Sequence, residues 1–240
     1  MSLPLSDRRR VLRGVVAAAA APLLGACDRL SQNETVVRTL GSVEQLSQAA
    51  HKAVAGRRAM AQEFTQADVV ARFRSNGTAM PDDADYQALM KGGFSEWKLQ
   101  ARGLVAQPAA FSLADLRAMP SRTQITRHDC VEGWSAIGKW KGVPLSRVLE
   151  LVKPLPQARY VVFRCADSME GGPGDSRYYE SIDLDDAYHP QTLLAYELND
   201  APLPVDNGAP LRARIERQLG YKHAKYVRSE ERRVGKECRL

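Results

Sequence analysis

From residue 61 onward the chain consists of short segments separated by loop signals, and this feature constrains its fold most. Short apolar or alternating runs predict strands at 97–101, 123–127, 160–164, 182–184 and 193–198. Ser112 stands where it can cap a short helix, and Pro144 and Pro154 bracket another helix at 145–152. Since the strands do not alternate with long helices, the pattern predicts an α+β domain of mixed sheets with short helices.

The first 26 residues have the composition of a bacterial export signal. Asp7–Arg13 is rich in arginine, and the apolar run that follows at 14–26 is too short for a membrane-spanning helix of about 20 residues. The paired arginines favour the twin-arginine route over an ordinary secretory signal. Leu24–Cys27 resembles a lipobox, so Cys27 is expected to carry lipid; a plain cleavage site is the alternative. We therefore expect a periplasmic protein, lipid-anchored to the inner membrane.

The remaining chain divides into three parts. Residues 28–60 are expected to form a polar tether and then an amphipathic helix at 42–60, where apolar residues recur at helical spacing. The main domain is expected at 61–228. Residues 229–240 carry four basic and three acidic residues with little apolar content. We interpret this atypical tail as the result of a truncation or an assembly artefact.

The charge of the chain gives no support to nucleic-acid binding. The formal net charge is +6, but four arginines and one aspartate in 1–26 contribute +3 of it, and the tail contributes +1. The body between them carries only about +2, which is not the basic stripe that nucleic acids require. A local basic pocket for a small anion remains open.

Cys130 is the strongest candidate for chemistry, because it lies among charged, polar and aromatic residues in Arg127–Ser135, with Trp140 ten residues after it. Four interpretations stay open: a ligand of a metal or metal cofactor, a nucleophile paired with a histidine, half of a disulfide with Cys165, or a buried structural cysteine. A zinc site is weakly indicated, because the histidines are scattered through the sequence at 51, 128, 189 and 223. His189 precedes a proline and is expected in a turn.

A second group of candidates lies at 206–225, where glycines alternate with basic residues. Glycine allows a backbone to approach a ligand closely, and arginine forks suit phosphate oxygens. The segment is therefore compatible with a phosphorylated cofactor. Taken alone, it is more typical of a solvated basic strand edge.

Together these motifs resemble a known family. The motifs are, in order, Cys130–Ser135 with Trp140, 142–145, Asn207–Arg212 and 220–222. They are similar to motifs of the molybdopterin-binding domain of the sulfite oxidase superfamily. The similarity is strongest to its exported single-domain branch, which includes methionine sulfoxide reductases. It spans about Asn76 to Val227 and implies a sulfite-oxidase-like α+β fold.

The resemblance also implies roles for individual residues. Cys130 would be the protein thiolate on molybdenum. Arg127 would lie near the metal, and Tyr178 and Tyr179 would form pocket walls. The pterin and its phosphate would be held by the following residues: Asn76, Cys165, Asn207, Arg212, Gly220, Tyr221 and Lys222. Cys165 departs from the threonine of the reductases, which puts its role and the substrate in doubt.

The function implied by the resemblance is oxygen-atom transfer with a molybdenum–molybdopterin cofactor. Reduction of a sulfoxide such as oxidised methionine is favoured, with electrons from a membrane haem protein or a soluble cytochrome. Sulfite oxidation is the alternative within the class, and a lipoprotein that keeps the fold as a non-catalytic binding module is the alternative of another class. A cysteine hydrolase would instead need a Cys130 that reacts freely with thiol probes.

Overall fold

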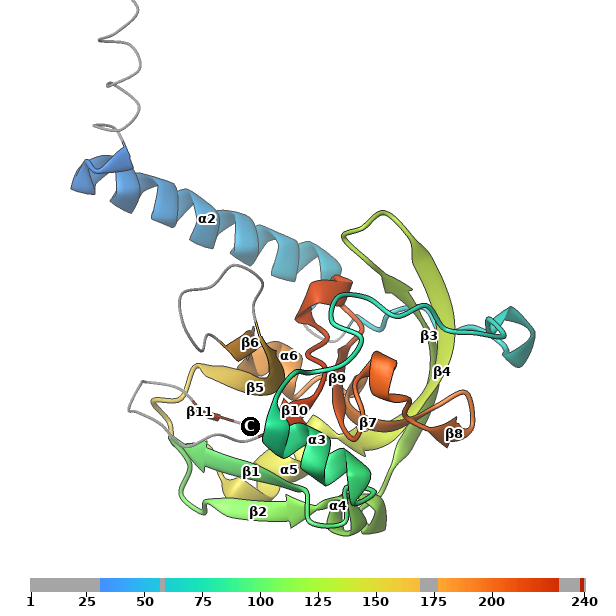
Figure 1. Ribbon diagram of the computed structural model, residues 1–240. Coiled ribbons are helices and arrows are strands. Elements are labelled where there is room, and N and C mark those ends of the chain that lie inside the picture. The colour runs from blue at the N-terminus through green and yellow to red at the C-terminus, as the bar shows by residue number, and fades with distance from the viewer. Residues whose placement is uncertain (1–30, 57–58, 169–176, 229–237, 240) are drawn as a thin grey trace, which may run out of the picture. The chain divides into compact units, whose positions relative to one another are not determined.

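The computed structural model describes residues 31–56, 59–168, 177–228 and 238–239 (Figure 1). The chain divides into two compact units, Met1–Ala59 and Met60–Leu240. The predicted export signal and the lipidation site Cys27 lie outside the described residues. Within the described part, no helix combines the length and the apolar character that crossing a membrane requires.

The described part of the first unit is one helix, α2 (Glu34–Ala55). The side-chain oxygen of Asn33 accepts hydrogen bonds from the backbone N–H groups of Thr35 (3.0 Å) and Val36 (3.2 Å), and so caps the start of the helix. The expected helix at 42–60 is therefore found over 42–55, but it begins earlier, at Glu34, and ends at Ala55. The prediction of a polar tether is wrong for 34–41, where the capped start extends the helix.

The second unit contains two sheets of short, mainly antiparallel strands. The first has the order β10-β5-β11-β1-β2, with β6 also paired to β5; the second has the order β3-β4-β7-β8, with β9 also paired to β7. The strands of the first sheet are β1 (Lys98–Gly103), β2 (Ala109–Ser112), β5 (Tyr160–Ser168), β6 (Arg177–Asp183), β10 (Val227–Arg228) and β11 (Cys238–Arg239). Those of the second are β3 (Arg122–Asp129), β4 (Ser135–Pro144), β7 (Thr192–Leu198), β8 (Ala201–Pro202) and β9 (Arg212–Ile215).

Short helices connect these strands. They are η1 (Gln66–Asp68), α3 (Ala84–Lys91), α4 (Leu113–Ala118), α5 (Leu145–Val152), α6 (Leu184–Ala187), η2 (Val205–Asn207) and η3 (Gly220–Lys222). The cap of α4 is the one that the sequence predicted: Ser112 Oγ accepts from the Asp115 N–H at 3.1 Å, and the Asp115 carboxylate accepts from the Ser112 N–H at 2.8 Å. The longest of these helices, α3 and α5, have eight residues each.

The largest hydrophobic core joins both sheets through α5. Leu145, Val148, Leu149 and Val152 of α5 are fully buried in one cluster that contains residues of β1 and β5 from the first sheet and of β4 and β7 from the second. The apolar positions of α5 recur at spacings of three and four, which places them on one face. This shared core fixes the two sheets relative to each other, and the loops of both then meet at one site.

Most of the predicted elements are present. The α+β class is confirmed, helix 145–152 has the predicted bounds, and the five predicted strands are found as β1, β3, β5, β6 and β7. Strands β4 and β9 and helix α3 were not predicted. The tail interpretation remains a prediction, because 229–237 and 240 lie outside the described residues; Cys238–Arg239 pairs with both β5 and β1.

Candidate functional site

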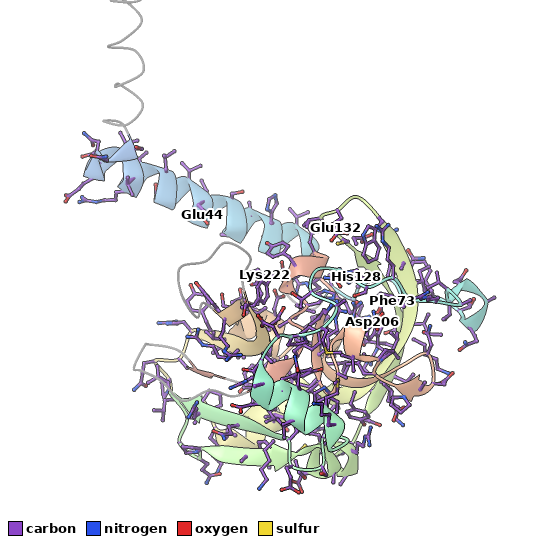
Figure 2. All side chains as sticks on the ribbon, viewed as in Figure 1. Glu44, Phe73, His128, Glu132, Asp206 and Lys222 are labelled. Carbon is purple, nitrogen blue, oxygen red and sulfur yellow. The ribbon has the colours of Figure 1, made fainter. Side chains whose placement is uncertain are left out.

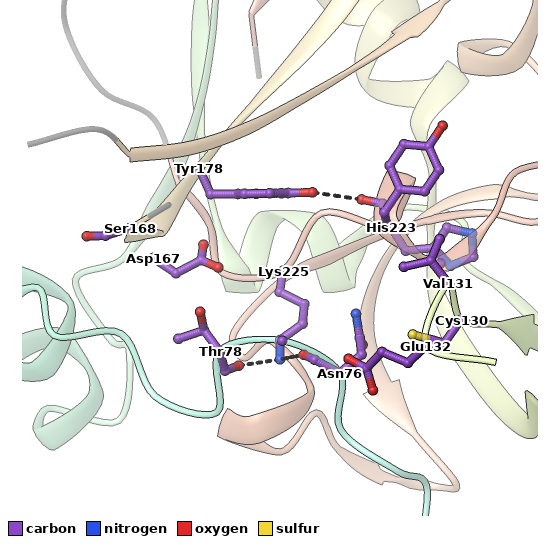
Figure 3. A pocket seen from close by; sticks show the side chains of 13 residues that line it. Asn76, Thr78, Cys130, Val131, Glu132, Asp167, Ser168, Tyr178, His223 and Lys225 are labelled. Carbon is purple, nitrogen blue, oxygen red and sulfur yellow. Dashed lines mark hydrogen bonds between the residues drawn. The ribbon is translucent and has the colours of Figure 1, made fainter. Parts of the chain in front are cut away.

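Cys130 lies in the tight turn between β3 and β4. Its backbone N–H donates to the Trp134 carbonyl (2.9 Å), and its carbonyl accepts from the Gly133 N–H (3.1 Å). Gly133 has φ +83°, a conformation that L side chains rarely adopt, which explains the glycine in the turn. The thiol is free, 9% exposed, and lines a cavity of about 360 Å³ (Figure 3). Such a turn presents one sulfur atom to a defined space.

Lys225 forms another wall of this cavity together with the segment Asn76–Thr78. Its Nζ donates to the carbonyls of Asn76 (2.7 Å), Thr78 (2.5 Å) and Asp206 (2.7 Å). Figure 3 shows the side chain extended across the cavity towards Asn76 and Thr78. Burial, and then the charge of Arg212, lower the pKa of Lys225 to about 7. An ammonium held in this way would be stabilised by an added anion.

Arg212 on β9 is fully buried and only partly satisfied. Its Nη1 donates to the Asn207 carbonyl and its Nη2 to Asn76 Oδ1, both at 3.1 Å, and the guanidinium lies 5.4 Å from the centre of the Trp140 ring. Among the described residues, Arg212 Nε and Asn207 Nδ2 are buried donors with no hydrogen-bond partner. Burial and the neighbouring Arg214 lower the pKa of Arg212 to about 9, whereas a Cys130 thiolate would raise it. The interpretation of this segment as a solvated strand edge is therefore wrong.

The turn Gly220–Lys222 approaches the Cys130 hairpin from the opposite side. A Cβ at Gly220 would lie 2.5 Å from His128 Cε1 and 3.1 Å from the Asp129 carbonyl, so only glycine fits there. Gly220 and Tyr221 line the cavity. Lys222 does not line it; its Nζ donates to Glu180 Oε2 (2.8 Å) and to the Ser181 carbonyl (3.1 Å). The predicted phosphate contact of Lys222 is thus not supported by its direction.

The structure brings Asn76, Cys130, Gly220, Tyr221 and Tyr178 to the cavity, as the sequence predicted, and sets Asn207 and Arg212 behind it. The Tyr178 hydroxyl donates to the Tyr221 carbonyl at 3.1 Å, which ties β6 to the η3 turn. These seven residues come from strands, short helices and loops at distant places in the sequence, so their meeting is the main support for the predicted site.

Three other predicted site residues point elsewhere. The Arg127 side chain is 55% exposed and pairs with Asp129 at 3.0 Å, because β3 turns alternate residues outward. Tyr179 is 52% exposed and lies 5.1 Å from the Arg164 guanidinium. Cys165 is buried in the hydrophobic core, and burial raises the pKa of its thiol. Roles for Arg127 near a metal, Tyr179 in a pocket wall and Cys165 at the cofactor are not supported by these positions.

Sequence reasoning missed Asp167, which lines the cavity from the end of β5. It is 8% exposed, its Oδ1 has no hydrogen-bond partner among the described residues, and burial raises its pKa to about 6. In the view of Figure 3, Asp167 and Cys130 lie on opposite sides of Lys225. Only its place after a buried strand could have indicated it, and a carboxylate two residues beyond Cys165 is a weak signal.

Two of the four histidines, His128 and His223, meet beside the site, with ring centres 5.1 Å apart. Burial, and then the charge of Arg214, lower the pKa of each, so both are neutral in the folded protein. His189 lies in the predicted turn between α6 and β7, where its Nδ1 accepts from the Gln191 N–H at 3.3 Å. Throughout the described ranges, no three His, Cys, Asp or Glu side chains gather as a metal site would require.

The residues around the cavity fit an anionic ligand that has both hydrogen-bond donors and acceptors. Arg212 and Lys225 are buried cations whose carbonyl partners carry no opposite charge. Unused donors on Asn207 and Arg212 and an unused acceptor on Asp167 are the groups that a phosphorylated heterocycle would satisfy. Because one thiolate is the only soft ligand lining the cavity in the described part, a bound metal would need further ligands from a cofactor.

Comparison with known proteins gives a consistent result. Residues 87–232 match the family described as "Oxidoreductase molybdopterin binding domain". The chain is 44% identical over 135 residues to the YedZ1 subunit of Azospira oryzae, covering 56% of this chain and 48% of that protein. It is 34% identical over 171 residues to the protein-methionine-sulfoxide reductase catalytic subunit MsrP of Ralstonia nicotianae, covering 68% and 51%.

Among solved structures, the sulfane dehydrogenase SoxCD from Paracoccus pantotrophus aligns with a TM-score of 0.49 and 20% identity, covering 60% of this chain and 38% of that chain. The chain spans about half the length of the curated relatives it matches.

Proposed function

The chain belongs to the family of oxidoreductase molybdopterin-binding domains, and from this premise we propose that it reduces sulfoxides, with methionine sulfoxide as the model substrate. The family match supports molybdopterin as the cofactor and an oxidoreductase as the class of enzyme. The names of the MsrP relatives favour sulfoxide reduction over sulfite oxidation. One observation supports the proposal most: the Cys130 thiol and the buried Lys225 line the same cavity, and the incompletely bonded Arg212 lies behind it.

The proposed roles follow from the chemistry of each side chain. Cys130 presents its sulfur as the protein ligand of molybdenum. Arg212 and Lys225, with the Asn207 amide, suit the phosphate of the cofactor, and the Asp167 carboxyl can accept a hydrogen bond from a ring N–H. When bound, the cofactor supplies the two-electron, oxygen-atom chemistry of the reaction.

The rest of the site is suited to orienting the substrate. The bond from Tyr178 to the Tyr221 carbonyl holds η3 beside the cavity, and Tyr221 is 43% exposed. The Cys130 turn adds Val131, which is 64% exposed. These side chains offer apolar contact to a thioether group at the point where solvent enters. The reaction takes up two electrons and two protons per sulfoxide and releases the sulfide and water.

Export and partners belong to the same proposal. The arginines and the apolar run of 1–26 support twin-arginine export to the periplasm, and Cys27 is a candidate lipid anchor to the inner membrane. A separate haem protein, either membrane-bound or a soluble cytochrome, would deliver the electrons. The mass of the mature N-terminus tests the anchor: a diacylated or triacylated Cys27 is expected, and an unmodified N-terminus contradicts it.

The activity is tested with reduced dye as the electron donor. Purified full-length protein is expected to oxidise reduced benzyl viologen only when methionine sulfoxide is present, and Cys130→Ser should abolish this. Sulfite-dependent reduction of an acceptor dye without sulfoxide reduction would favour a sulfite-oxidising enzyme. A molybdenum-loaded protein that is inactive with both substrates would favour a non-catalytic binding module.

A further inference from the structure

Every second residue of β3 points inward and meets side chains at β9. Gln124 Nε2 donates to Glu216 Oε1 at 2.9 Å, and Arg214 Nη1 lies 3.0 Å from His128 Nδ1. Between these contacts, Arg214 Nη2 reaches Thr126 Oγ1 at 3.5 Å. Since β4 and β7 separate β3 from β9 in the sheet order, the sheet must curl to bring these side chains together.

The centre of this contact is the ion pair between Arg214 and Glu216, both of which are fully buried. Arg214 Nε and Nη2 bind the two oxygens of Glu216 at 3.0 and 2.8 Å, and the guanidinium lies 4.3 Å from the centre of the Trp140 ring. A planar bidentate ion pair that packs on an indole ring holds the guanidinium in a fixed orientation. Arg214 therefore presents Nη1 to His128 in a fixed direction.

The other edge of the His128 ring supports the cofactor-binding loops. His128 is fully buried and packs against Gly220 without room for a Cβ. Its ring centre is 5.5 Å from that of Trp134, in the Cys130 turn, and 5.8 Å from that of Phe73 (Figure 2). The ring thus touches the Cys130 turn, the η3 turn and the segment before Asn76.

We propose that His128, held by the Arg214–Glu216 pair, is a positioning residue that sets the orientation of the Cys130 thiolate relative to the η3 turn. This inference rests on the proposed role of Cys130 as the molybdenum ligand. His128 precedes Cys130 by two residues on the same face of the chain, so a shift of its ring changes the turn that directs the sulfur. We therefore predict that replacing His128 changes the orientation of the Cys130 sulfur in addition to any effect on folding.

The test compares His128→Ala with His128→Gln, which keeps a side-chain acceptor for Arg214. Val148→Ala, which changes the buried core at α5, is the matched control. In cofactor-free protein, the alkylation rate of Cys130 by iodoacetamide, followed by peptide mass, is expected to rise at least fivefold in His128→Ala. It should stay within twofold of wild type in His128→Gln and in Val148→Ala.

In molybdenum-loaded protein, the Mo(V) electron paramagnetic resonance spectrum reports how the thiolate is oriented. His128→Ala should change its g-values, whereas His128→Gln should keep them close to those of wild type and Val148→Ala should leave them unchanged. Glu216→Gln, which loosens Arg214 without touching the Cys130 turn, should alter alkylation and spectrum in the same direction as His128→Ala, but less. If His128→Ala does not fold, Glu216→Gln provides the test of the proposed role of His128 instead.

Wild-type alkylation rates and spectra in His128→Ala, or in Glu216→Gln where the alanine variant is unfolded, would overturn the inference. Equal changes in all variants including Val148→Ala would also overturn it, because they would show a general loosening of the core. A wild-type protein that binds no molybdenum would instead overturn the proposed function, and the alkylation rates distinguish the two failures because they need no cofactor.

Discussion

The two sequence motifs contain basic residues in two opposite environments. Arg212 and Lys225 form one group, and Arg127 and Lys222 form the other. The first two are buried, and both bind backbone carbonyl groups beside the cavity. The second two are paired with carboxylates, Asp129 and Glu180, and do not line the cavity. Basic composition therefore indicates an anion site only where the fold leaves the cation without a carboxylate.

Replacing the buried arginine should have the largest effect on cofactor binding. In Arg212→Met, the phosphate would lose charge-assisted hydrogen bonds worth about 1.5–3 kcal/mol each, so the affinity for the cofactor should fall roughly 100-fold and the molybdenum content should fall with it. Arg127→Met, the exposed counterpart, should keep wild-type molybdenum. Elemental analysis of both purified variants checks this, and equal losses would remove the distinction between the two groups.

Replacing each of the two lysines should change the free energy of unfolding by different amounts. Lys225→Met leaves three carbonyl acceptors without their donor, which should lower the free energy of unfolding of the cofactor-free protein by about 2 kcal/mol. Lys222→Met removes one partly exposed ion pair and should cost less than about 1 kcal/mol. Urea denaturation measures both. A larger loss in Lys222→Met would contradict the assignment of the buried role to Lys225.

Lowering the pH should reduce the free energy of unfolding through His223, which lies near the buried cations Arg212 and Arg214. Burial and these charges hold its pKa well below 6.5 in the folded state. The unfolded chain therefore binds a proton that the folded chain does not, and stability falls as pH drops below about 6.5, with a contribution from His223 that approaches about 1.4 kcal/mol per pH unit. His128, whose pKa is also lowered, adds a contribution of the same sign.

His223→Gln should remove its own contribution to this slope and leave the contribution of His128. Urea denaturation at several pH values between 7 and 5.5 gives the slopes. An unchanged slope in His223→Gln would show that His223 takes up its proton without unfolding.

The smallest effect is expected for the neighbouring tyrosines of β6, which repeat the comparison within one strand. Tyr178→Phe removes the hydroxyl that donates to the Tyr221 carbonyl and should cost about 1 kcal/mol of unfolding free energy. Tyr179→Phe should be neutral, since that ring is half exposed. Thermal denaturation of the two variants decides it, and equal melting temperatures would refute the proposed tie between β6 and η3.

The sequence predicted elements whose pattern is local. Helix α5 has apolar residues at helical spacing between two prolines, and β7 contains the apolar run Leu193–Tyr196, so both were found. Strand β4 was missed because Gly138 and Gly142 interrupt its alternation. A Cβ at Gly142 would lie 2.2 Å from the Leu194 carbonyl, so close packing against β7 requires glycine there. That requirement is visible only once β7 is in place.

The motifs of the site could be predicted from the sequence, but the directions of its side chains could not. The resemblance to the sulfite oxidase superfamily is confirmed by the family match, and Cys130, Asn76 and Gly220 reach the cavity. Arg127, Tyr179 and Cys165 do not, because the alternation of a strand and the depth of the core decide which way each points. Asp167 and the contacts of Lys225 depend on loops that meet only after both sheets have packed.

The central claim is that Cys130 binds molybdenum in a cavity prepared by buried cations. The most direct measurement is the molybdenum content of wild type and Cys130→Ser, expressed with the same cofactor supply and confirmed as folded. We predict about one molybdenum per chain in wild type and a content near zero in the variant. Wild type without molybdenum, or a serine variant that retains all of it, would contradict the account.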